Sequence, residues 1–150
     1  MPEYFAFEAD FVGTLRCIPM AARLRLDLSG VKLKLNEWSK LDRAARETAA
    51  TLACATEAEI AAYRASISAL VASACGAPPA PLAELPPREW DDGSNVPAQV
   101  AEQARAAGTD VGPEAWRRLS PLQRFALIKL SRSGHENKNF VPACDEFGLA

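Results

Sequence analysis

The sequence is poor in the residues that usually carry metal or redox chemistry. Of its 150 residues, only His135 is a histidine, and four are cysteines: Cys17, Cys54, Cys75 and Cys144. No CxxC pair and no Cys/His cluster occurs, so zinc-ribbon and thioredoxin-like sites have no support. We expect the cysteines to be small buried hydrophobic residues rather than a disulfide or redox set.

Motifs of catalytic sites are missing as well. The sequence contains no Gly-rich phosphate loop, no GxSxG elbow, no HExxH and no nucleophile beside a base. Nothing in it resembles a complete active site. We therefore expect a protein that is not an enzyme, with no catalytic residues, no metal ligands and no cofactor.

Neither a basic excess nor a long apolar run is present. Lys and Arg total 17 against 19 Asp and Glu, a net charge of −2, which argues against binding to nucleic acid or an anionic membrane. No apolar run approaches the ~18–20 residues that span a bilayer. The N-terminus, MPEYFAFEAD, has acidic residues where a signal peptide needs a basic and then an apolar run. We expect a cytoplasmic protein.

What remains is the composition of an ordinary globular protein. Hydrophobic residues make up 49% and charged residues 24% of the chain, and 150 residues suffice to bury one core. The sequence predicts a single domain over residues 1–150 and leaves the oligomeric state open.

Helix signals recur along the chain. Thr56 and Glu59 form a capping box before an apolar stripe that ends at Gly76, and Asp42 can cap a shorter helix through Leu52. Ser120-Pro121 starts a helix that is apolar around most of its circumference. We expect that buried helix to end at Ser133-Gly134, and a last short helix to begin at Phe140.

One segment has an ambiguous pattern. Residues 23–35, RLRLDLSGVKLKL, alternate as a β-hairpin with a Ser-Gly turn would. The competing interpretation is a helix with Pro19 in its first turn and Gly30 beyond its end.

An internal repeat favours the helix. Superposing Trp38 on Trp116 sets an offset of 78 residues, which also pairs Pro19 with Pro97, Gly30 with Gly108, Leu41 with Leu119, and Arg46 with Arg124. In the second copy, the residues between Pro97 and Gly108 are rich in Ala, Gln and Glu and are typical of a helix. We expect both tryptophans to be core anchors.

The predicted fold is therefore an all-α, compact multi-helix domain. It contains a duplicated helical unit, at about residues 18–46 and 96–124, and a proline-rich crossover over residues 77–96 that Trp90 pins to the body. A flexible linker between two small lobes is the alternative for the crossover. Lobes of that size would be marginal alone, which favours one domain.

Two groups of polar residues are candidates for function. His135 and Glu136 could form an acid–base or metal-ligand pair, but no third group is evident, and a structural role in the loop is favoured. Arg124 and its counterpart Arg46 could bind an anion or a partner's carboxylate. Their repetition favours a structural role, in which each guanidinium satisfies carbonyl groups at a helix end.

Three stretches together resemble one protein family: FEADFVGTLRCIPM, GVKLKLNEW and LSPLQRFALIKLSRSGHENKNFVPA. The chain from Phe7 to Leu149 is similar to the nitrate reductase-associated proteins. The resemblance implies an accessory factor for biogenesis or activity of assimilatory nitrate reductase, a molybdenum and iron–sulfur enzyme. The family motif carries over onto these residues: Arg16, Cys17, Ile18, Pro19, Arg124, His135, Glu136, Asn137, Asn139 and Phe140.

The leading hypothesis is a protein that binds nitrate reductase or one of its maturation factors. The candidate contact residues are Arg16, Arg124, His135, Glu136, Asn137 and Asn139. The alternative is a small-ligand or metal-binding protein that uses the loop around His135.

Overall fold

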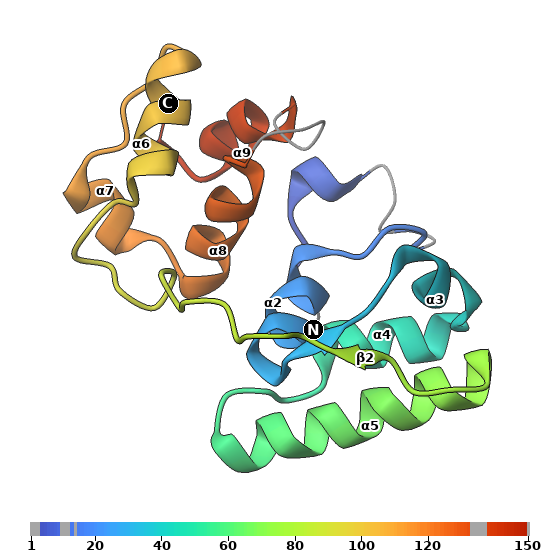
Figure 1. Ribbon diagram of the computed structural model, residues 1–150. Coiled ribbons are helices and arrows are strands. Elements are labelled where there is room, and N and C mark those ends of the chain that lie inside the picture. The colour runs from blue at the N-terminus through green and yellow to red at the C-terminus, as the bar shows by residue number, and fades with distance from the viewer. Residues whose placement is uncertain (1–3, 10–12, 14, 133–137, 150) are drawn as a thin grey trace. The chain divides into compact units, whose positions relative to one another are not determined.

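The chain is mostly α-helical. The computed structural model describes residues 4–9, 13, 15–132 and 138–149, and its elements are shown in Figure 1. The chain divides into two compact units: Glu8–Pro86 forms most of the first, and Pro87–Ala150 together with Phe5–Phe7 forms the second. The helical fold class is confirmed, with one two-stranded sheet added. The single domain over residues 1–150 stays a prediction.

Over the residues that the structure describes, the first unit contains four α-helices, which follow the short 3-10 helix η1 (Ala6–Glu8). They are α2 (Met20–Ser29), α3 (Leu35–Lys40), α4 (Arg43–Thr51) and α5 (Glu57–Cys75). Helix α2 packs against α4 and α5, and α3 also packs against α5 (Figure 1). The core between these helices includes fully buried side chains from each of them: Ala22, Trp38, Ala49, Tyr63, Ile67 and Val71.

Helix α2 resolves the ambiguous alternating segment. It begins after Pro19 and ends at Gly30, whose φ of 72° lies in the left-handed region that favours glycine. The helical interpretation of this segment is confirmed, and the hairpin interpretation is wrong. Because Pro19 offers no side-chain cap, the carboxylate of Glu8 accepts a hydrogen bond from the first amide of the helix, that of Met20, over 2.8 Å.

The caps of the next two long helices agree with their sequence signals. Asp42 accepts a hydrogen bond from the Ala45 amide at the start of α4, and α4 ends at Thr51, one residue before the predicted end at Leu52. Thr56 and Glu59 form the predicted capping box at the start of α5, and Gly76 ends that helix with a φ of 85°. Local signals were sufficient here because each cap lies within three residues of its partner.

A small antiparallel sheet joins two distant segments of the first unit. Strand β1 (Val31–Lys32) pairs with β2 (Ala80–Pro81), with Val31 opposite Pro81. The Leu82 amide donates to the Gly30 carbonyl over 2.8 Å and extends the pairing. The alternation after Gly30 therefore does correspond to a short strand. Its partner lies in the proline-rich segment, and pairing between segments so far apart leaves no local signal.

In the described part of the second unit there are also four α-helices. They are α6 (Ala98–Ala106), α7 (Pro113–Arg118), α8 (Pro121–Leu130) and α9 (Phe140–Glu146), and α8 packs against both α6 and α9. Fully buried aromatic and aliphatic side chains fill its interior: Val100, Trp116, Phe125, Leu127, Leu130 and Phe140. Both predicted tryptophan anchors, Trp38 and Trp116, have no exposed surface.

The helix starts of the two units follow the same spacing. In the first unit α2, α3 and α4 begin at residues 20, 35 and 43, and in the second α6, α7 and α8 begin at residues 98, 113 and 121, a constant separation of 78. Prolines 19 and 97 stand directly before the first helix of each series. The helix predicted between Pro97 and Gly108 is confirmed as α6.

Helix α8 ends earlier than expected. Its start agrees with the prediction, because Ser120 and Gln123 form a capping box and Pro121 is the first helical residue. It ends at Leu130, however, and not at Ser133-Gly134. The Ser131 hydroxyl donates to the Ile128 carbonyl over 2.8 Å, a local bond that competes with helix continuation. Gly134 itself lies outside the described residues.

The proline-rich segment has little regular structure. Residues 77–97 contain only the two residues of β2 as strand and no helix. Trp90 is 4% exposed, and its ring meets that of Phe125 edge-on, with 5.0 Å between the centroids. Trp90 therefore anchors its part of the segment within the second unit.

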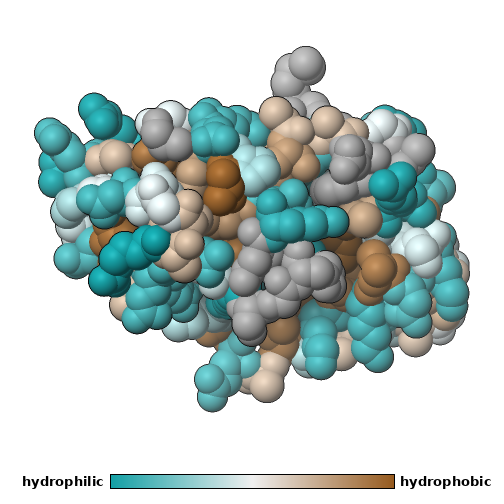
Figure 2. All heavy atoms as spheres, turned by 90° about the horizontal axis from the view of Figure 1, so that it is seen from above, coloured by the Kyte–Doolittle hydropathy of each residue, from teal (hydrophilic) through white to brown (hydrophobic). Residues whose placement is uncertain are grey.

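The surface carries few large apolar side chains. Within the described part of the chain, those that are exposed are Leu35, Leu85 and Val141. Figure 2 shows one face, on which hydrophobic residues form small groups among hydrophilic ones. Among the helices that the structure describes, none has the length and hydropathy needed to cross a bilayer.

Candidate functional site

Arg124 is a buried cation held by backbone carbonyl groups. Its side chain leaves the apolar helix α8, and the residue is 7% exposed. The Nε atom donates to the Trp90 carbonyl over 2.7 Å, and Nη1 lies 3.4 Å from the carbonyl oxygens of both Trp116 and Arg117. The last two carbonyls belong to the C-terminal end of α7, where a helix leaves acceptors without partners. Arg124 therefore joins residue 90 to the end of α7.

Arg46 makes the corresponding contacts in the first unit. Its Nε donates to the Trp38 carbonyl over 3.3 Å, and Nη2 donates to the Ser39 carbonyl over 2.9 Å, at the end of α3. A further bond runs from Nη1 to the Leu15 carbonyl over 3.3 Å. Both arginines thus satisfy helix-end carbonyls, the structural role that the sequence favoured for them.

The two tryptophans hold the segment that precedes each helical series. The Trp38 indole N–H donates to the Leu15 carbonyl over 2.7 Å, and the Trp116 indole N–H donates to the Asp92 carbonyl over 3.4 Å. A buried indole needs an acceptor for its N–H, and a backbone carbonyl in a loop provides one. In each unit, tryptophan and arginine therefore fix the loop against a short helix.

The loop at residues 91–95 is folded closely around Arg124. A Cβ atom on Gly93 would lie 2.6 Å from Arg124 Nη1 and 3.4 Å from the Cα of Arg117, so only glycine fits without a displacement. Asp92 accepts hydrogen bonds from the Ser94 hydroxyl and amide. These bonds, the hydroxyl one first, lower the pKa of the Asp92 carboxyl, and the charge of Arg124 contributes less.

The candidate contact residues differ in how the structure places them. Arg16 is exposed, in the segment before α2. Asn139 is half-buried and stands directly before α9, where its side chain caps no amide. His135, Glu136 and Asn137 lie outside the described residues. Among the described residues, Arg124 donates to the carbonyls of Trp90, Trp116 and Arg117, none of which is a candidate contact residue.

Glu8 is a polar residue that the sequence did not single out. It is 2% exposed, and its carboxylate accepts a hydrogen bond from the amide of Met20, twelve residues later. A carboxylate at the amino end of a helix is stabilised by the helix dipole and by the unpaired amides. No spacing rule predicts such a cap, because the loop that returns Glu8 to α2 has no fixed length.

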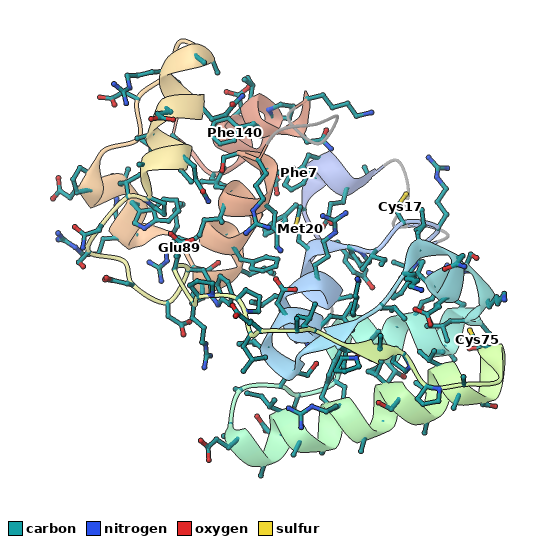
Figure 3. All side chains as sticks on the ribbon, viewed as in Figure 1. Phe7, Cys17, Met20, Cys75, Glu89 and Phe140 are labelled. Atoms are coloured by element: carbon teal, nitrogen blue, oxygen red, sulfur yellow. The ribbon has the colours of Figure 1, made fainter. Side chains whose placement is uncertain are left out.

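The cysteines are free thiols in two environments. Cys54 and Cys144 are buried, as expected, whereas Cys17 and Cys75 are half-buried. Figure 3 shows the sulfur atoms of Cys17 and Cys75 at separate places in the first unit. Burial, and secondarily the charge of Asp145, raises the pKa of the Cys144 thiol to about 11. Over the described residues, no three His, Cys, Asp or Glu side chains gather as metal ligands would.

Tyr63 is the main polar group in the core of the first unit. Its ring has no exposed surface, and its hydroxyl donates to the Ala49 carbonyl over 2.6 Å. Burial raises the pKa of this phenol far above its ordinary value of 10.0. The bond ties α5 to α4, which is a structural role.

Comparison with known proteins gives one family. Residues 4–147 match the family described as conserved nitrate reductase-associated protein. No curated protein and no solved structure matches the chain significantly. The match covers both units, from the aromatic N-terminal segment to the end of α9, and agrees with the resemblance of the three sequence stretches. The chain therefore belongs to the nitrate reductase-associated protein family.

Proposed function

We propose that this protein is a non-enzymatic accessory factor that supports the biogenesis or activity of assimilatory nitrate reductase by binding to another protein. The observation that carries the proposal is membership of the nitrate reductase-associated family over residues 4–147. The family name describes an association with the reductase, and an accessory protein acts through contact with a partner. The partner is nitrate reductase itself or one of its maturation factors, and the binding takes place in the cytoplasm.

The contacts of Arg124 distinguish it from the other candidate contact residues. All three of its hydrogen bonds go to backbone carbonyls, and the guanidinium is almost fully covered. Such a side chain shapes the surface near α7, with its Nε and Nη1 donors committed to backbone carbonyls. We therefore assign Arg124 to the scaffold.

Arg16 and Asn139 remain as candidate contact residues, with His135, Glu136 and Asn137. Arg16 is an exposed cation on a segment without regular structure, and such side chains gain new hydrogen bonds on binding at little cost in ordering. Asn139 keeps its amide free of a capping bond at the start of α9. Both can donate to acceptors on a protein surface, and Asn139 can accept as well.

Co-purification tests the proposal directly. A tagged protein expressed in nitrate-grown cells should recover nitrate reductase or a maturation factor, and deletion of its gene should lower reductase activity. Arg16→Ala and His135→Ala should weaken the recovery, whereas Arg105→Ala, which removes an exposed arginine outside the candidate group, should not. The proposal fails if neither partner is recovered and reductase activity survives the deletion.

The alternative, a small-ligand or metal-binding protein that uses the loop around His135, makes a different prediction. Purified protein would then contain a stoichiometric element, or its melting temperature would rise with nitrate, molybdate or a divalent metal. Elemental analysis and a thermal-shift screen of the parent and His135→Ala proteins separate the two functions. A partner recovered equally well from metal-free protein favours the accessory role.

We also propose that the chain contains a duplicated helical unit and a proline-rich crossover. The constant separation of 78 residues between helix starts supports the duplication of residues 18–46 in residues 96–124. The matched bonds of Arg46 and Arg124 to the carbonyls of Trp38 and Trp116 support it further. Residues 77–96 then form the crossover that connects the two copies.

A further inference from the structure

The two ends of the chain meet in an aromatic cluster within the second unit. The Phe5 ring meets the Phe147 ring edge-on with 5.0 Å between centroids, and Phe7 lies 6.4 Å from the same ring. Phe5 and Phe7 stack on each other at 5.3 Å. The Phe7 amide also donates to Oε1 of Glu146 over 3.2 Å.

Helix α9 needs support from outside itself. It has seven residues, and a helix of that length is unstable in isolation because the cost of nucleation is not recovered. Asn139 offers no side-chain cap at its start. Its buried side, Phe140, Ala143 and Cys144, faces the interior, and α8 packs against it. The aromatic cluster at Phe147 therefore covers the end of α9 that follows its last turn.

The N-terminal part of this cluster is short. Only Phe5–Phe7 belongs to the second unit, and from Glu8 the chain belongs to the first. A short segment can open locally at a fraction of the free energy of global unfolding. Phe7 is half-buried, and its hydrogen bond to Glu146 lies at the exposed surface. Opening this contact requires the exposure of two rings, of which Phe5 is buried and Phe7 is half-buried.

We propose that Phe5–Phe7 is a clasp that holds α9 in place, and that release of the clasp loosens α9 and exposes the Cys144 thiol while the first unit stays folded. Because α9 begins directly after Asn139, the clasp also controls how firmly that candidate contact residue is held. This last consequence rests on the proposed function. The clasp itself does not, since it is defined by contacts within the chain.

The alkylation rates of two buried cysteine thiols measure the opening of α9. Cys144 lies in α9 with a pKa raised to about 11, and Cys54 lies in the first unit, also buried. A protected thiol reacts only from an opened state, so its alkylation rate reports the population of that state. Mass spectrometry after timed treatment with N-ethylmaleimide at pH 8 would follow both residues in one sample, and Cys54 would serve as the internal reference.

Phe7→Ala and Glu146→Ala each remove one part of the clasp. We expect Cys144 to be alkylated about tenfold faster in Phe7→Ala, since an aromatic pair and its neighbouring contacts together correspond to that factor. Glu146→Ala should give a smaller increase. Cys54 should be unchanged in both variants. Hydrogen exchange should rise in residues 140–149 and stay constant in α5.

Matched variants separate the clasp from general damage. Val141→Ala changes an exposed residue of α9, and Phe7→Tyr keeps the ring, so both should leave the alkylation of Cys144 within about twofold of the parent. The clasp is refuted if Cys144 reacts at the parental rate in both Phe7→Ala and Glu146→Ala. It is also refuted if Cys54 and Cys144 become reactive together, because opening would then be global. Neither outcome depends on a partner.

Discussion

The Nη1 atom of Arg124 lies 3.4 Å from the carbonyl oxygen of Trp116, eight residues earlier in the chain. This bond places a positive charge at the C-terminal end of α7, where the helix dipole favours a cation. The same guanidinium binds the Trp90 carbonyl through Nε over 2.7 Å. A planar group with several donors can serve acceptors in different directions, which a lysine ammonium on a flexible stem does less well.

Removing this side chain should destabilise the protein. In Arg124→Ala, the carbonyls of Trp90 and Arg117 lose the guanidinium as donor at a residue that is 7% exposed, and the Trp116 carbonyl keeps only the bond from the Leu119 amide. We expect the free energy of unfolding to fall by about 2–4 kcal/mol, because hydrogen bonds to charged groups are the stronger kind and buried acceptors without partners are costly. Urea denaturation followed by far-UV circular dichroism measures the change.

Two further variants identify the cause of that loss. Arg124→Lys keeps the charge but cannot reach three carbonyls, so it should recover only part of the stability. Arg118→Ala removes an exposed arginine of α7 and should change the free energy of unfolding by less than about 0.5 kcal/mol. Equal stability of Arg124→Lys and the parent would show that charge alone is required.

Gly93→Ala should destabilise the protein through Arg124. The new Cβ would lie 2.6 Å from Arg124 Nη1, so the guanidinium must shift, which weakens its bonds to the carbonyl acceptors. We expect a loss of roughly 1–3 kcal/mol in the free energy of unfolding, as for other overpacked sites. Gly112→Ala is the steric control, since a Cβ there meets no atom within 4 Å and the cost should be limited to that of a poorer N-cap residue, about 0.5–1 kcal/mol.

A double-mutant cycle makes the Gly93 prediction specific. If the steric conflict acts on the guanidinium, Gly93→Ala should cost much less in the Arg124→Ala background than in the parent, a departure from additivity that residues in contact show. Additive losses would mean that the alanine strains the loop by another route, such as the Cα of Arg117 at 3.4 Å.

Sequence reasoning found the elements whose signals are local. The caps at Asp42, Thr56 and Ser120 and the glycine stops at Gly30 and Gly76 lie next to the helices they bound, and those helix bounds agree with the sequence, apart from the ends of α4 and α8. The offset of 78 residues was decisive for α2, since its own alternation is typical of a strand. Without the counterpart helix at residues 97–108, the alternation of apolar and polar residues in residues 23–35 would by itself have favoured the hairpin.

Long-range contacts were not predictable from one sequence. The pairing of β1 with β2, the cap of α2 by Glu8 and the cluster of Phe5 with Phe147 each join residues whose separation no local rule sets. For the candidate site, sequence anticipated that Arg46 and Arg124 would satisfy helix-end carbonyls. It did not anticipate the third acceptor of each, Leu15 or Trp90, because both lie in loops that precede the helices.

The capping box of α5 predicts a pH dependence of stability. Hydrogen bonds from the amides of Thr56 and then Ala55 lower the pKa of Glu59 below its ordinary value of 4.5. A carboxyl with a lowered pKa in the folded state contributes stability that is present above about pH 4.5 and is lost as the pH falls through the folded-state pKa. Glu59→Gln should therefore flatten the decline in urea midpoint between pH 6 and pH 3.

Glu57→Gln is the matched control for that prediction. It removes the same charge from the same helical turn, but Glu57 accepts no amide of the cap. Its acid profile should keep the slope of the parent. If Glu57→Gln flattens the profile as much as Glu59→Gln does, the dependence comes from general charge near the start of α5 and not from the capping box.

The single domain predicted for residues 1–150 can be tested with the three tryptophans. Trp38 belongs to the first unit, and Trp90 and Trp116 belong to the second. Units at or below ~80 residues rarely stabilise themselves with one hydrophobic core, so we expect both to unfold in one cooperative transition.

The fluorescence of Trp38→Phe reports the second unit, and that of a Trp90→Phe/Trp116→Phe double variant reports the first. Within each variant, the fluorescence midpoint in urea should coincide with the far-UV circular dichroism midpoint, as two-state unfolding requires. Midpoints that differ within one variant would instead support two lobes that fold separately.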